Sequence, residues 1–210
     1  HINFLFGEPA EFKDGLIEIA YTPAITGAVN KAEFFDLSRL GDAADFAYKV
    51  NSQQGVNVYV GAALRIPDTF PGGRSSIDDY YAATCIWADL DDAGVAEAAR
   101  SKYEKLPPSL VVVTGRHPHL RAQAWWKLMH PASDHAEHKE NLAHICAALN
   151  GDTAVVDSAR VMRLGGSIAW PKKDGRSPEL TEIKIPEQKT VMVMAERFKS
   201  YFPGVSIPLT

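Results

Sequence analysis

The chain has 210 residues, a length that fits one large domain or two small interlocked ones. Hydrophobic residues make up 46% and charged residues 23%, which excludes a disordered chain and is typical of a soluble globular protein. No apolar run approaches the roughly 18 residues of a membrane-spanning helix, and two cysteines are too few for a disulfide framework or a four-cysteine zinc site. The net charge of −4, taken globally, weighs against a nucleic-acid binder.

Hydrophobic spacing predicts strands that alternate with helices along the chain. The strands are expected where β-branched, aromatic or alternating apolar residues gather, at 16–20, 56–64, 82–90, 110–114, 122–129 and 180–185. Helices are expected at 31–51, 93–105, 133–149 and 191–202, with Ser133 as the N-cap of the third. Residues 67–76 are expected to form a loop.

The element order predicts the fold class, α/β (α+β). From 82 to 185 the order β-α-β-β-α-β matches the split βαβ, ferredoxin-like arrangement that RRM domains share. We expect one domain over 1–210, because no linker or repeat divides the chain. Within it, 1–80 would form an N-terminal lobe, 81–186 the core and 187–210 a closing helix and tail.

The ends of the chain predict its setting. No basic-then-apolar signal segment opens it, so a cytoplasmic location with no membrane partner is expected. Because the chain begins with His1 and not with Met, we expect further domains on either side.

Charge is unevenly distributed along the sequence. Residues 89–97 hold acids and no base, whereas 110–130 and 158–176 are basic. An acidic cluster between two basic segments suits a site where carboxylates hold cations and Arg or Lys holds phosphates. Surfaces of mixed sign also fall into such blocks by chance, so this pattern alone leaves the question open.

The first candidate site ends the predicted strand 82–90. Asp89 and Asp91 are two residues apart, so both carboxylates would share one face of the strand, roughly 6–7 Å apart. Such a pair can chelate Mg²⁺ or Mn²⁺, or bridge two ions. The alternative is an acidic turn that ends a strand and starts the next helix, where Asp92 suits the helix dipole.

Two further candidate sites are basic. Residues 111–119 form a strand followed by a glycine turn with Arg116, His117 and His119, which can present N–H groups and cations to a polyphosphate. Residues 150–173 contain two acids, two arginines, a Gly-Gly-Ser turn and two lysines at 172–173. The alternatives are a solvated hairpin loop and arginines paired with nearby acids.

Other motifs are absent or have ordinary explanations. The sequence has no phosphate-binding P-loop, dinucleotide fingerprint or nucleophile elbow. His135 and His138 are expected to be solvated, and Cys85 and Cys146 to lie in the core. Of Trp125 and Trp126, one is expected in the core, and the other is free to stack on a base.

Together the three segments resemble the motifs of the archaeo-eukaryotic primase superfamily, the primase-polymerases of plasmids, phages and archaeal or eukaryotic replication. The family's D-x-D/E strand is similar to CIWADLD, its S-G-x-G-x-H turn to TGRHPH, and its third motif to NGD, DSARVMRLGGS and PKK. The resemblance covers about 82–173, and NVYVGAALR upstream resembles the plasmid and phage branch.

The resemblance implies a DNA-templated nucleotidyltransferase that makes or extends short oligonucleotides on single-stranded DNA. Asp89 and Asp91 would bridge two Mg²⁺ or Mn²⁺ ions, with Asp152 as the third acid and Asp157 as the runner-up. The residues implied in binding the NTP or dNTP are Thr114, Arg116, His119, Gln123, Arg160, Arg163, Ser167 and Lys172. No zinc is expected, and a helicase would be a missing domain or a separate protein.

The sequence departs from the family pattern at two positions. His117 stands where the second motif has Gly, and Gly165 where the third has Pro. The family histidine is therefore either His119 or is replaced by Gln123. Two other classes remain open, a metal-dependent nuclease and a non-catalytic nucleic-acid or origin-binding module on the same fold.

Overall fold

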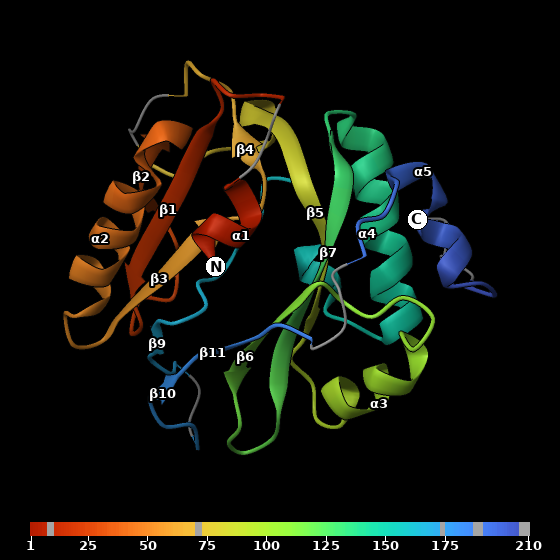
Figure 1. Cartoon of the computed structure of the whole chain (residues 1–210). Helices are drawn as coiled ribbons and strands as arrows, with labels where there is room; N and C mark the ends of the chain where they lie inside the picture. The colour runs from red at the N-terminus through yellow and green to blue at the C-terminus, as the bar shows by residue number, and fades with distance from the viewer. Residues whose placement is uncertain (8–10, 70–72, 173–174, 187–190, 206–210) are drawn as a thin grey trace.

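In a computed structural model, the described part of the chain folds around a nine-stranded sheet with β2 beside β1 (Figure 1). The structure describes residues 1–7, 11–69, 73–172, 175–186 and 191–205. In sheet order the strands are β11 (Glu182–Lys184), β6 (Leu110–Gly115), β7 (Arg121–Ala132), β5 (Tyr80–Leu90), β4 (Leu64–Arg65), β1 (Leu16–Pro23), β3 (Val56–Gly61) and β8 (Val161–Arg163), with β2 (Lys31–Asp36) off this path. A separate small sheet pairs β9 (Ile168–Ala169) with β10 (Glu179–Leu180).

Helices cover both halves of the large sheet. Helix α2 (Leu40–Asn51) packs on β1, β2 and β3, and α1 (Ile2–Phe6) lies between the halves, against α2 and β5 (Figure 1). Helices α3 (Val95–Lys102), α4 (His135–Leu149) and α5 (Ala195–Phe198) pack on β5 and β7. Short 3₁₀ turns are η1 (Leu37–Arg39), η2 (Ile77–Asp79), η3 (Thr153–Val155) and η4 (Lys199–Tyr201). Within the described ranges, none of the helices has the length and hydrophobicity that crossing a bilayer requires.

The predicted split βαβ unit is present in the core. Strands β5 and β6 are joined through α3, and β7 lies between them, antiparallel to both. A ferredoxin-like sheet has its last strand beside the first, but here β11 pairs with β6 at the opposite edge. The reason is that β4 occupies the position beside β5 and joins the N-terminal strands to the core.

The helix predicted over 31–51 is wrong in its first third. Residues 31–36 form β2, which pairs along its whole length with β1, and the α-helix begins only at Leu40. Phe34 and Phe35 match helical spacing, but aromatic residues also favour strands, and the partner strand decides between the two. The pairing with β1 involves a separate segment of the chain, so the spacing of residues within 31–51 does not reveal it.

Other boundaries differ where the chain changes partner. The strand predicted over 56–64 divides into β3 and β4, and the one over 180–185 divides at Thr181, whose hydroxyl hydrogen-bonds the carbonyl oxygens of Leu164 and Ser167. The closing helix shortens to α5 and η4 because Val193 instead pairs with β7. Helix α4 is capped by Asp134 and not by Ser133.

The core corrects two expectations for single residues. His138 is fully buried, where its ring bonds to the Ser158 hydroxyl and the Cys85 carbonyl, so it is not solvated. Trp125 and Trp126 are both fully buried, so neither offers a free face to a base. Both cysteines are buried as predicted.

A buried ion pair connects the N-terminal sheet to the segment that follows α4. Arg65 Nη2 lies 2.8 Å from Glu18 Oε2, and both side chains are fully buried. Arg65 also donates to the carbonyl oxygens of Ser158 and Ala159, and Glu18 accepts hydrogen bonds from the Ser75 backbone N–H and hydroxyl. The pair therefore holds two loops against β1 and β4, one of which leads into β8.

Candidate active site

A cleft of about 270 Å³ gathers most of the residues predicted from the three motifs. Strands β3 and β8 form one side, and β5, β6 and β7 contribute the other. The predicted residues that line it are Asp89, Asp91, Thr114, Gln123, Arg160, Arg163 and Lys172. Arg116, His119, Asp152, Asp157 and Ser167 are not among its lining residues.

Asp89 and Asp91 lie at the end of β5, as predicted. Burial, together with the negative charges of Asp91 and Asp152, raises the pKa of Asp89 to about 7, and Arg163 and Arg160 act in the opposite direction. Neighbouring negative charges destabilise the ionised form of a carboxyl group, and a nearby cation stabilises that form. Asp91 is partly exposed and faces two arginines, Arg121 and Arg176.

Asp152 approaches the acid pair through the backbone. Its N–H donates to the Asp89 carbonyl at 2.8 Å, and a Cβ at Gly151 would lie only 3.0 Å from that same oxygen. Glycine at 151 therefore permits the approach. The Asp152 carboxylate itself caps η3 through Ala154 N–H, and that of Asp157 accepts from Ala159 N–H.

The donor set fits a divalent cation in its chemistry. Among the residues that the structure describes, no three His, Cys, Asp or Glu side chains form a ready metal-binding group. Mg²⁺ in phosphoryl-transfer sites, however, is commonly held by one or two carboxylates, with substrate phosphates and water completing the shell. Asp89 and Asp91 meet that requirement.

Arg163 is fixed on the opposite side of the cleft. Its guanidinium lies 4.6 Å from the centre of the Tyr59 ring and donates to Asn57 Oδ1. Asn57 also bonds both backbone groups of Trp170, so one buried amide holds β8 and the segment after β9 together.

Gln123 supports the same strand. It lies opposite Asp89 in the β5–β7 pairing. In the orientation that satisfies both of its partners, its amide bonds the backbone N–H and carbonyl of Arg163. Gln123 therefore links the acid-bearing strand to β8.

Of the predicted residues of the second motif, Thr114 lines the cleft, whereas Arg116 and His119 do not. Arg116 forms an exposed ion pair with Glu182, 3.0 Å long. His119 contacts the acid segment through its ring Nε2, 2.7 Å from the Asp91 carbonyl oxygen.

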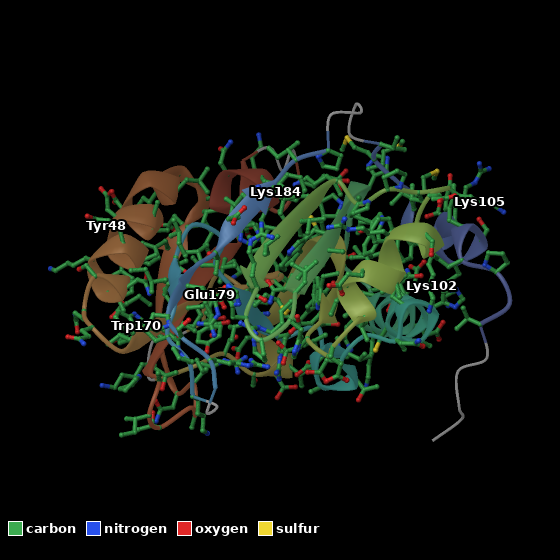
Figure 2. The ribbon with its side chains drawn as sticks, turned by 90° about the horizontal axis from the view of Figure 1, so that it is seen from below. Tyr48, Lys102, Lys105, Trp170, Glu179 and Lys184 are labelled. Carbon is green, nitrogen blue, oxygen red and sulfur yellow. The ribbon has the colours of Figure 1, made fainter. Side chains whose placement is uncertain are left out.

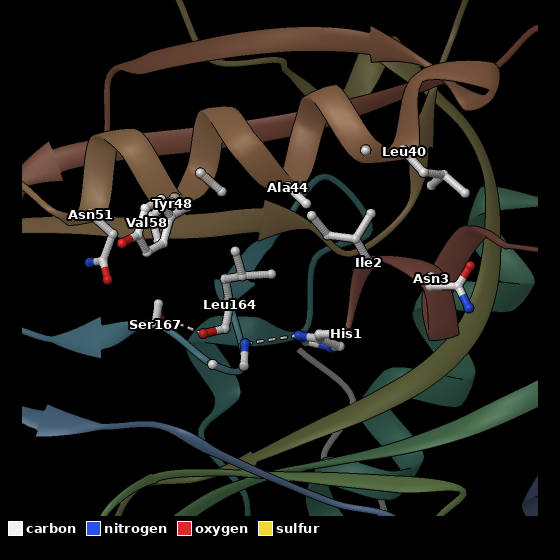
Figure 3. Close-up of a pocket in the computed structure, with 14 residues that line it drawn as sticks. His1, Ile2, Asn3, Leu40, Ala44, Tyr48, Asn51, Val58, Leu164 and Ser167 are labelled. Carbon is white, nitrogen blue, oxygen red and sulfur yellow. Dashed lines mark hydrogen bonds between the residues drawn. The ribbon is translucent and has the colours of Figure 1, made fainter.

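Ser167 lies in a different cavity. This second cavity, of about 450 Å³, is mainly apolar and lies between α1, α2 and the turn 164–167 (Figure 3). The Ser167 hydroxyl donates to the Leu164 carbonyl at 2.6 Å. The glycine turn therefore separates the two cavities, with Arg163 on the side of the acids.

Sequence reasoning missed several residues of the cleft. Arg121 is buried beside Asp91. The sequence could have identified it, because Arg121 lies two residues before Gln123 and therefore on the same face of β7. No such signal marks the others, since tertiary contacts alone bring them in: Asn57, Tyr59, Trp170 and Arg176.

Comparison with known proteins places this fold. No family model and no curated protein sequence matches the chain. Among solved structures, the AEP domain (PP-N190) of the cyanophage S-2L primase-polymerase matches with 21% identity and a TM-score of 0.61, covering 90% of both chains. Primase RepB′ matches with 19% identity and a TM-score of 0.60, covering 90% of this chain and 56% of that one.

A third structure is the catalytic domain of RepB′ in complex with initiator DNA. It matches with 19% identity and a TM-score of 0.57, over 90% of this chain and 84% of that one. The chain therefore has the fold of these primase domains, and the fold that the sequence resemblance implied is confirmed.

Proposed function

We propose that this chain is the catalytic domain of a primase-polymerase, a nucleotidyltransferase that makes or extends short oligonucleotides on single-stranded DNA. The observation that carries the proposal is the cleft, where Asp89 and Asp91 lie in the same cavity as Arg160, Arg163 and Lys172. The match to a primase domain solved with initiator DNA supports DNA as the template.

Local charge explains how a chain of net charge −4 would bind a polyanion. Among the described residues, five cations and two acids line the cleft, so the net charge of these side chains is positive.

The proposed reaction joins the α-phosphate of an NTP or dNTP to the 3′-oxygen of a growing strand, and pyrophosphate leaves. Divalent cations, when bound, would lower the pKa of the attacking hydroxyl and stabilise charge on the pyrophosphate. Asp89 and Asp91 would hold Mg²⁺ or Mn²⁺ there. Arg160, Arg163 and Lys172 would bind the phosphates and orient the α-phosphorus for attack. The sequence carries no P-loop, so a helicase would be another domain or protein.

The test is primer extension and unprimed synthesis on single-stranded DNA, with Mg²⁺ or Mn²⁺ and with NTPs and dNTPs tested separately. The double variant Asp89→Ala, Asp91→Ala is expected to lose incorporation completely while its circular dichroism spectrum is retained, because both carboxylates that would hold the cations are gone. Asp92→Ala, an exposed acid in the next position, is the matched control and should retain incorporation.

Three outcomes would overturn the proposal. Extension by the double variant at the wild-type rate would show that Asp89 and Asp91 do not form the catalytic site. Degradation of labelled single-stranded DNA with Mn²⁺ and no nucleotide, without incorporation, would identify a nuclease. DNA binding that is unaffected by a chelator, again without incorporation, would identify a binding module.

A further inference from the structure

Arg121 is the buried arginine of the cleft, with a side chain only 6% exposed. Its Nη1 donates to the His117 carbonyl at 2.6 Å, and its Nη2 donates to Glu179 Oε1 at 3.0 Å. Its Nε lies 3.7 Å from Asp91 Oδ1. One guanidinium is thus shared between two carboxylates, with the shorter contact on the side of Glu179.

Glu179 belongs to none of the three motifs. It lies on β10 (Figure 2), which pairs with β9. Its side chain is 14% exposed. Besides Arg121 it accepts the backbone N–H groups of Arg116, at 2.6 Å, and His117, at 3.3 Å. A single carboxylate therefore holds both the turn after β6 and the arginine that faces Asp91.

Gly115 shows how closely these groups fit. A Cβ at this position would lie 1.8 Å from Arg121 Nη2 and 2.9 Å from Glu179 Oε1. No side chain is compatible with the pair as it stands, so the glycine of the second motif makes room for it. The contact between Arg121 and Glu179 is built into the site and is not an incidental surface pair.

We propose that Glu179 and Arg121 are positioning residues that control how strongly Asp91 binds a divalent cation. Glu179 holds the Arg121 guanidinium away from full contact with Asp91, and so limits its competition with a cation for that carboxylate. Arg176 Nη2 lies 3.4 Å from Asp91 Oδ2, so it approaches the other oxygen of the same carboxylate. This inference rests on the proposed function, because it assumes that Asp91 binds a cation.

The test measures Mn²⁺ binding directly, without nucleotide, from the electron paramagnetic resonance signal of free Mn²⁺. Glu179→Gln is expected to weaken Mn²⁺ binding about threefold or more, because the released guanidinium moves onto Asp91. Arg121→Gln is expected to tighten it by a similar factor, because the competing charge is gone. The double variant should resemble Arg121→Gln, since Glu179 acts through Arg121.

Two further variants separate contact from charge. Glu182→Gln removes the same charge from an exposed partner of Arg116 and should leave Mn²⁺ affinity unchanged. Glu179→Asp keeps the charge but draws the carboxylate back, and should weaken binding in the same direction as Glu179→Gln. It also provides the measurement if Glu179→Gln does not fold, which thermal melting would show.

The inference fails if Glu179→Gln and Glu182→Gln shift affinity equally, if Glu179→Asp matches the wild type, or if the two single effects add in the double variant. A failure of the proposed function is distinct, since there the wild-type protein itself would bind no Mn²⁺ or incorporate no nucleotide.

Discussion

The two sides of the cleft are built in different ways. Asp89 lies near the end of β5, an eleven-residue strand buried along most of its length, and Asp91 directly follows the strand. The opposite side, from η3 to β9, contains only short elements and is held by side chains from elsewhere: Trp87, Arg65, Gln123 and Asn57. A site can therefore combine a rigid strand end, which sequence alone predicts, with a segment whose position depends on distant partners.

The largest expected loss of folding stability comes from the side of the cleft between η3 and β9, which distant side chains hold in place. Glu18→Ala leaves the Arg65 guanidinium buried without its carboxylate and should cost about 3–5 kcal/mol of unfolding free energy. Urea unfolding measures this loss. Asp42→Ala, which breaks the exposed pair with Arg39, is the control and should cost less than about 1 kcal/mol. Equal losses in the two variants would mean that the buried pair does not support this segment.

On the side of the cleft that carries Asp89 and Asp91, a substitution should instead raise the free energy of unfolding. The folded-state pKa of Asp89, about 7, lies above the usual 3.8, so wild-type stability falls as pH rises between these values. Asp89→Asn has no such titration and should be more stable than wild type at pH 8 by about 2 kcal/mol, a figure reduced from the full shift because Asp89 is partly accessible.

Unfolding of Asp89→Asn and wild type at pH 8 and pH 4 tests this. The advantage should disappear near pH 4, where the wild-type carboxyl is protonated in the folded state. An equal difference at both pH values would contradict the linkage to Asp89.

A smaller effect is expected at Asn57, where the position of Arg163 can be tested separately from the stability of the fold. Asn57→Ala releases Arg163 and Trp170 and should raise the KM for nucleotide about five- to tenfold, because the phosphate-binding arginine loses its fixed geometry. Asn51→Ala is the matched control, since it removes similar bonds to Ile168 beside the second cavity. Asn51→Ala should lower the melting temperature while the KM is retained, and a KM that rises equally in both would make Asn57 only structural.

The smallest effect is expected for Ser167. Ser167→Ala removes the hydrogen bond to Leu164 and should change the nucleotide KM by less than about twofold, since the hydroxyl lies in the second cavity. Steady-state kinetics measures this, and a tenfold rise would place the hydroxyl on the triphosphate.

The sequence by itself determined β5, the split βαβ unit and the acid pair, because a continuous apolar run and a spacing of two are local properties of the chain. It also selected seven of the described residues that line the cleft. Only the tertiary structure decided that 31–36 is a strand, that Ser167 faces another cavity and that Arg116 pairs with Glu182. It also decided the contacts of Arg121 with Asp91 and Glu179, which join segments far apart in sequence, although the spacing of Arg121 and Gln123 already predicts that both lie on one face of a strand. Pairing, burial and charge between distant segments are set by packing, and no local pattern encodes them.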